Sequence, residues 1–110
     1  MRPISVGINP TAGATTTVYT VPTGYYALFN LLYVHNTGSG SKTLTVQWYD
    51  ASAATTIDIL SAVTYTSKTY TQFDNAYVVF EEGDQLRVTP ESGSAFSIIA
   101  TFDQIGLTRQ

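Results

Sequence analysis

The sequence predicts an all-β protein: an antiparallel β-sandwich, jelly-roll or Ig-like, in a single domain with a short N-terminal arm. Thr, Val, Tyr, Ile and Phe, which suit a pleated surface, dominate from end to end. Apolar and polar residues alternate in short runs separated by turn residues, as in sandwiches and barrels. No window shows a helical period with caps. The length of 110 residues is that of one domain.

The elements are expected in the following order. Residues 1–14 carry Pro3, Gly7, Pro10 and Gly13 and predict an irregular arm with a short strand from Ile4 to Ile8. Residues 15–110 form the sandwich domain. Its strands are expected over residues 15–21, 25–36, 42–50, 55–60, 63–73 (with a split near residue 67), 76–80, 85–90 and 95–104.

Side chains alternate across a strand, so the parity of a residue predicts its face. Three strands have one apolar parity, which predicts one buried face: Leu44, Val46 and Trp48; Leu86 and Val88; Phe96, Ile98, Ala100 and Phe102. The run 25–36 is apolar on both parities: Ala27, Phe29, Leu31 and Tyr33 on one, Leu28, Leu32 and Val34 on the other. A strand apolar on both faces is covered on both. We therefore expect a loop, the arm or another subunit over its second face.

The low charge of the chain limits its functions. Charged residues make up 12%, against about 25% in typical soluble domains. Such a neutral surface suits a protein covered by partners or one outside the cell. A net charge of −3 with five Lys and Arg argues against nucleic-acid binding. We expect no membrane partner, no signal peptide and, without cysteine, no disulfide.

Three of the eight acidic residues cluster in the stretch Glu81-Glu82-Gly83-Asp84. It lies between two runs of strand character, so Gly83 and Asp84 predict a structural turn, with Gly83 at positive φ and Asp84 bonded to nearby backbone. Glu81 and Glu82 fall on opposite faces if the strand continues. Their spacing matches neither a calcium loop nor an acid/base pair, so we expect no metal here.

Few residues are candidates for catalysis. His35 is the only histidine, and no carboxylate stands at ligand spacing beside it. The serines lie in no nucleophile elbow. The Gly38–Ser41 loop lacks the lysine and helix of a phosphate loop. The sequence therefore predicts a protein that is not an enzyme, with no cofactor.

The aromatic residues and the arm indicate contact surfaces. Tyr49 and Tyr70 lie on faces opposite to apolar or core positions, and exposed Tyr anchors protein interfaces well. In the arm, Ile4, Val6 and Ile8 form one alternating apolar face, which could add a strand to a neighbour's sheet. We predict these five residues as the assembly interface.

Five motifs give the chain a resemblance to small β-sandwich virion structural proteins of tailed bacteriophages, over Thr15 to Ile105. They are Val21-Pro22-Thr23-Gly24, Asn36-Thr37-Gly38, Thr45-Val46-Gln47-Trp48, Gly83-Asp84-Gln85-Leu86 and the strand from Ser97 to Phe102. Such proteins serve as capsid decoration proteins, head fibres or tail and neck appendages. The resemblance offers no catalytic residues.

The resemblance and the neutral surface together favour a virion structural protein that decorates the capsid. Its expected partners are itself, as a symmetric trimer, and the major capsid protein or other virion proteins. A neck, tail or fibre component is the alternative position. The rival from another class is a carbohydrate-binding module, in which Tyr rings and Trp48 would stack on sugars. Coplanar exposed rings would favour sugar binding, and rings spread over several faces would favour assembly.

Overall fold

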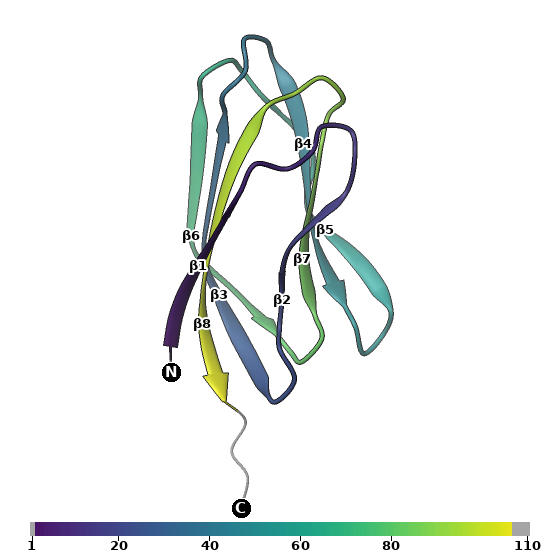
Figure 1. Ribbon diagram of the computed structural model, residues 1–110, viewed down its shortest axis with the longest axis vertical. Helices are drawn as coiled ribbons and strands as arrows, with labels where there is room; N and C mark the ends of the chain where they lie inside the picture. Colours follow the sequence, from purple (N-terminus) through teal and green to yellow (C-terminus); the bar gives the residue numbers. More distant parts are fainter. Residues whose placement is uncertain (1, 107–110) are drawn as a thin grey trace, which may run out of the picture.

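A computed structural model describes residues 2–106, apart from the side chains of residues 2 and 74–77. Within this range the chain forms eight strands: β1 (Arg2–Ile8), β2 (Thr16–Thr20), β3 (Tyr25–Asn36), β4 (Lys42–Asp50), β5 (Thr55–Tyr65), β6 (Tyr70–Phe80), β7 (Gln85–Pro90) and β8 (Phe96–Gly106) (Figure 1). The predicted all-β sandwich is confirmed. No helix of the described residues is long and apolar enough to cross a membrane.

The strand order identifies the sandwich as a jelly roll. Sheet A has the order β1-β8-β3-β6, and sheet B the order β2-β7-β4-β5. The antiparallel pairs β1–β8, β2–β7, β3–β6 and β4–β5 are those of one long hairpin. Rolling it up brings β3 beside β8 and β4 beside β7, which closes the two sheets. Of the two topologies that the sequence left open, the chain adopts the jelly roll.

The core lies between the inner faces of the two sheets. Phe29, Phe80 and Phe102 are buried at its centre, and the Tyr19 ring stacks on Phe102 with 4.2 Å between centroids. Burying one such side chain contributes roughly 1.5–3 kcal/mol. The parity predictions for β4, β7 and β8 are confirmed, since their apolar sets point into this core. Trp48 is only partly buried and packs against the core from its end of β4.

The face prediction for β3 is wrong because the strand contains a bulge. The register with β6 and β8 shifts between Phe29 and Leu31, so Asn30 is an extra residue. Parity reverses there. The buried set is therefore Ala27, Phe29, Leu32, Val34 and Asn36. The apolar residues switch parity at the bulge, so the inner face takes Leu32 and Val34, while Leu28, Leu31 and Tyr33 lie on the outer face. The expectation that another subunit covers this second face stays a prediction.

The boundaries around β5 and β6 also differ from prediction. The expected break near residues 61–62 is a pair of register shifts inside one continuous strand, with Ala62 at a φ of 49°. The real turn follows Tyr65, at the predicted split, where Lys68 has a φ of 61°. Residues 70–80 then form one strand where the sequence predicted two.

The segment predicted as an arm contains strand β1, which pairs with β8 from Arg2 to Ile8 as the edge of sheet A. Ile4, Val6 and Ile8 pack against the core of the same chain. The Ser5 and Thr101 hydroxyls, on the outer side, are 2.8 Å apart and share a hydrogen bond. Residues between Ile8 and Thr16 cross from sheet A to sheet B (Figure 1).

Candidate assembly surfaces

The described surface offers contact area rather than a reactive cluster. His35 faces outward on sheet A, between Tyr70 of β6 and Ser97 of β8. Within residues 2–106, leaving aside the side chains outside the description, no group of three or more His, Asp or Glu side chains is placed to hold a metal ion. The described surfaces that could contact a partner include the two outer faces, the sheet edges and a hollow between β3 and β6.

The buried carboxylate of Asp84 links the acidic turn of residues 81–84 to β4 and the loop after it by hydrogen bonds. Asp84 is 1% exposed, and its Oδ2 accepts hydrogen bonds from Trp48 Nε1 at 3.1 Å and from the Glu81 N–H at 2.9 Å. Its Oδ1 accepts one from the Ala51 N–H at 2.9 Å. Gly83 has a φ of 86°, a conformation strained for L side chains. Glu81 and Glu82 are exposed.

The outer face of sheet B is polar and internally bonded. Tyr49 lies on it under Arg87, whose guanidinium carbon is 4.2 Å from the ring centroid. The Arg87 Nε donates to Gln85 at 2.8 Å, and Gln47 donates to Asp58 at 2.9 Å. Polar groups already satisfied by neighbours gain little from a partner. Tyr49 is thus one member of a self-contained polar layer.

The outer face of sheet A carries exposed apolar side chains among polar ones such as Ser5, Thr101 and His35. Tyr70 is 61% exposed, the most open large hydrophobic side chain among the described residues, and its ring stacks on Tyr33 at 5.3 Å. Ile99 of β8, directly opposite Tyr33, is 41% exposed. Further along, Leu28 pairs with Val79, which is 39% exposed. The predicted interface residues Tyr49 and Tyr70 therefore lie on opposite outer faces.

Strand β5 forms an exposed edge of sheet B. It is 11 residues long, and among the described strands it pairs only with β4. Ile57 and Ile59 are 48% and 36% exposed. The register shifts between β4 and β5 and the charge of Asp58 are devices that discourage uncontrolled edge pairing.

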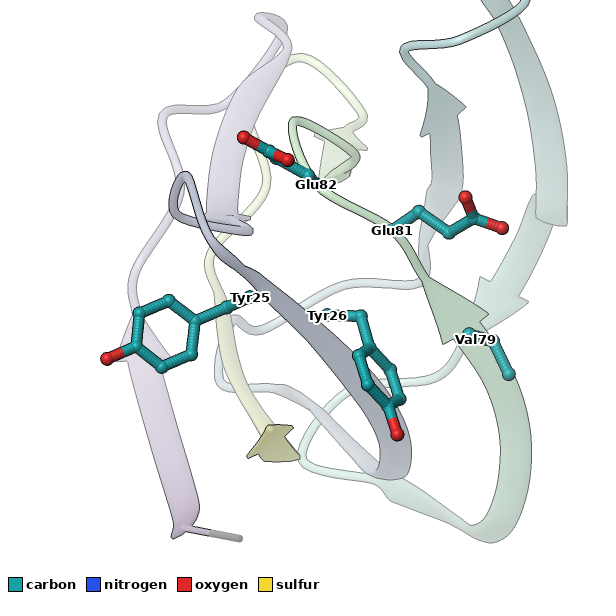
Figure 2. A pocket seen from close by; sticks show the side chains of 5 residues that line it. All are labelled: Tyr25, Tyr26, Val79, Glu81 and Glu82. Carbon is teal, nitrogen blue, oxygen red and sulfur yellow. The ribbon is translucent and has the colours of Figure 1, made fainter. Parts of the chain in front are cut away.

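A hollow of about 290 Å³ lies where β3 begins and β6 ends. It is lined by Tyr25, Tyr26, Val79, Glu81 and Glu82 (Figure 2). The Tyr25 and Tyr26 rings point to different sides of β3, and the two carboxylates point away from each other. The rings thus form no shared flat platform.

The buried hydroxyl of Tyr65 in the core allows a prediction about stability. Tyr65 is 6% exposed, and its hydroxyl has no hydrogen-bond partner among the described residues. Burial raises the pKa of Tyr65 above its usual 10, and this effect is larger than the lowering of the pKa by the Thr71 side chain. We expect Tyr65→Phe to leave stability unchanged or raise it by about 1 kcal/mol, because no bond is lost.

The same substitution has a pH signature. Because the pKa of the Tyr65 hydroxyl is higher in the folded than in the unfolded chain, the folded state favours the neutral hydroxyl. This contribution to stability is fully present below pH 10 and is lost as the pH rises through the folded-state pKa. Tyr65→Phe should therefore reduce alkaline destabilisation, measured by urea unfolding at pH 8 and pH 10.5. A loss of more than about 1 kcal/mol at pH 8 would show that the hydroxyl is bonded.

Sequence reasoning missed most of the apolar outer face. It selected Tyr70 but not Tyr33, because a uniform parity was assigned to β3, and it did not name Val79 of β6 or Ile99 of β8 as interface residues. The signal that could have shown the shift is Asn30, the polar residue in the middle of an apolar strand. The burial of Asp84 was also missed, since two of its three donors come from β4 and the loop after it.

The fold resembles solved structures of low sequence identity. A protein of Bacillus endospore appendages, which are disulfide-linked pili, matches with a TM-score of 0.57 and 12% identity, over 96% of this chain and 86% of that one. A protein of the T13 viral particle of IBDV matches with a TM-score of 0.54 and 9% identity, over 97% of this chain and 36% of that one. A protein of the infectious bursal disease virus Gt strain matches with a TM-score of 0.53 and 12% identity, over 92% and 31%.

These comparisons concern the fold alone. The chain spans about a third of the length of the two viral proteins. It contains no cysteine, so the disulfide linkage of the pili has no counterpart here. No family model and no curated protein matches the sequence.

Proposed function

We propose that this chain is a non-enzymatic structural protein of a bacteriophage particle, acting by docking to its own copies and to other virion proteins. The observation that carries the proposal is that large hydrophobic side chains remain exposed although the core is filled. Among the described residues they are Tyr25, Ile57, Ile59, Tyr70, Val79 and Ile99. Two of them, Tyr70 and Ile99, adjoin Tyr33 on the outer face of sheet A, and contiguous exposed apolar patches mark interaction surfaces.

The low charge content supports the same proposal, because a surface with 12% charged residues suits a protein whose faces are covered. A jelly roll also occurs in virus particles and surface appendages, as the solved structures illustrate. Capsid decoration is the position that we favour, with the neck, tail or a fibre as the second. The symmetric trimer expected from the sequence stays a prediction that native mass spectrometry decides.

Particle composition tests the proposal. Phage particles should be purified on a density gradient from cultures in which the gene is expressed, and analysed by mass spectrometry. We expect the chain to remain with the particles after washing in 1 M salt, because apolar contacts resist screening. A chain found only in the particle-free fraction would overturn the proposal.

The arm is proposed as an exchangeable strand. Among the described strands, β1 pairs with β8 alone and lies at a sheet edge, so β1 of a neighbouring copy could make the same hydrogen bonds. Ile4, Val6 and Ile8 would then fill the same inner positions in the neighbour. The β1–β8 contacts are the same whether β1 pairs within its own chain or with a neighbouring copy. Contacts made elsewhere in the assembly therefore determine which of the two pairings forms.

An introduced disulfide tests strand exchange. Ser5 and Thr101 are partners in the β1–β8 register, with hydroxyls 2.8 Å apart, and the chain has no other cysteine. The double variant Ser5→Cys/Thr101→Cys should cross-link chains covalently in the assembled state, seen on a non-reducing gel. Oxidised product that runs only as single chains would show that β1 stays with its own sheet.

The carbohydrate-binding alternative is less well supported. The rings of Tyr25 and Tyr26 diverge in Figure 2, and Trp48 is partly buried with its Nε1 bonded to Asp84. The exposed Tyr70 lies on the outer face of sheet A, far along β3 from Tyr25. Rings spread in this way favour assembly over sugar stacking.

A further inference from the structure

The outer face of sheet A has the composition of an interface rather than of a solvated surface. Its central strand β3 presents Leu28, Leu31 and Tyr33, flanked by Ile99 of β8 and Tyr70 of β6. Asp103 is the one described charged side chain on the outward positions of the four strands, and Asn30 donates to it at 2.6 Å. The stacked Tyr33 and Tyr70 rings resemble the rigid aromatic anchors common in binding hot spots.

Two backbone features place these side chains on the outside. The bulge at Asn30 reverses the parity of β3, so that Leu31 and Tyr33 face out while Leu32 and Val34 enter the core. On the neighbouring edge strand, Gly7 lies opposite Ile99. Without a side chain at Gly7, the apolar surface of Ile99 stays uncovered on that side.

We propose that this face joins two copies of the chain, sheet A against sheet A. The inference deepens the proposed function and rests on it, because it names the surface through which the copies assemble. The two-fold contact is self-complementary: Tyr33, Tyr70 and Ile99 of one copy meet the same region of the other. Facing sheets can pack in this way about 10 Å apart.

The size of the face agrees with a stable dimer. Strands β3 and β8 have 12 and 11 residues. At about 3.4 Å per residue and about 4.8 Å between strands, a four-stranded face covers roughly 600–700 Å². Two such faces would bury about 1,300 Å², which lies within the range of roughly 1,200–2,000 Å² for specific interfaces.

The charge distribution also favours a second copy of the chain as the partner on this face. Each copy has a net charge of −3, so contact between copies costs least through a face that brings few like charges together. Asp103 is the charged side chain on the described outward positions of this face, and Asp74, opposite Leu31 in the register, lies outside the described side chains. A basic partner protein would find only Asp103 to pair with on the described part of this face. The outer face of sheet B, with Asp58 and Arg87 already bonded to neighbours, offers no comparable apolar area.

A matched pair of charge insertions tests the contact in the full-length chain. Ile99→Glu places a carboxylate in the middle of the proposed interface. Thr17→Glu adds the same charge on the outer face of sheet B, opposite Arg87. Sedimentation velocity over a dilution series, with circular dichroism to verify folding, should show the Kd of self-association raised about tenfold or more by Ile99→Glu only.

The outcomes separate this inference from the proposed function. Equal weakening by both variants, no weakening by Ile99→Glu, or a wild-type trimer without even-numbered species would overturn the face-to-face contact. If the wild type is monomeric in solution and Ile99→Glu alone abolishes attachment to particles, the face binds another virion protein. That result would overturn the second-copy inference but support the proposed function, which the composition of purified particles tests independently.

Discussion

Replacing Asp84 by alanine should destabilise the chain by about 3–5 kcal/mol. The substitution leaves three hydrogen-bond donors without their acceptor: Trp48 Nε1 and the N–H groups of Ala51 and Glu81. A buried donor left unsatisfied costs roughly 1–3 kcal/mol, and these three bonds are partly buried, so each should fall toward the lower end of that range. Since a domain of this size is stable by only about 5–15 kcal/mol, urea unfolding should show a large decrease in the midpoint.

Glu82→Ala is the matched control, because it removes an exposed carboxylate from the same turn. Exposed charges contribute little, so the change should stay within about 0.5 kcal/mol. Asp84→Asn should fall between the two, since the amide oxygen can still accept. Equal small effects of Asp84→Ala and Glu82→Ala would contradict a structural role for the buried carboxylate.

Truncating Phe102 to alanine should cost about 3–5 kcal/mol, as large-to-small changes in filled cores do. The ring is fully buried and touches Tyr19, Phe29 and Phe80, with centroids 4.2, 5.1 and 5.4 Å away. The loss of this one ring, which packs against three other rings from both sheets, leaves a cavity that β8 alone cannot close. Thermal and urea unfolding of the variant measure the loss.

Ile99→Ala is the control on the same strand. Ile99 points to the opposite side of β8 and is 41% exposed, so its truncation should cost less than about 1 kcal/mol in the dissociated chain. If Ile99→Ala costs as much as Phe102→Ala under dissociating conditions, the assignment of inner and outer faces of sheet A is wrong.

Alternation predicted the inner faces where strands are regular. In β4, β7 and β8 every predicted apolar set points into the core, because no bulge interrupts the parity between those residues. In β3 the extra residue Asn30 reversed the alternation of inner and outer side chains. In β5 the bulge at Ala62 looked like a strand end, since local sequence does not distinguish an interruption from a register shift.

Long-range pairing could not be predicted at all. The β1–β8 ladder joins Ile4 to Phe102, and nothing local to the first residues specifies that partner. The same holds for Asp84, whose role depends on Trp48 and on the loop after β4. The exposed apolar face of sheet A follows from the combination of one bulge and the strand order, so it emerged only from the three-dimensional arrangement.

Cryo-electron microscopy of purified particles tests the central claim most directly. The account predicts eight-stranded sandwiches in symmetry-related copies on the outside of the particle, with the sheet A faces of neighbouring copies in contact. Particles that contain the chain but show it as isolated copies, with the sheet A face open to solvent, would contradict the proposed assembly surface. Particles without any density for this fold would contradict the account of the chain as a virion structural protein.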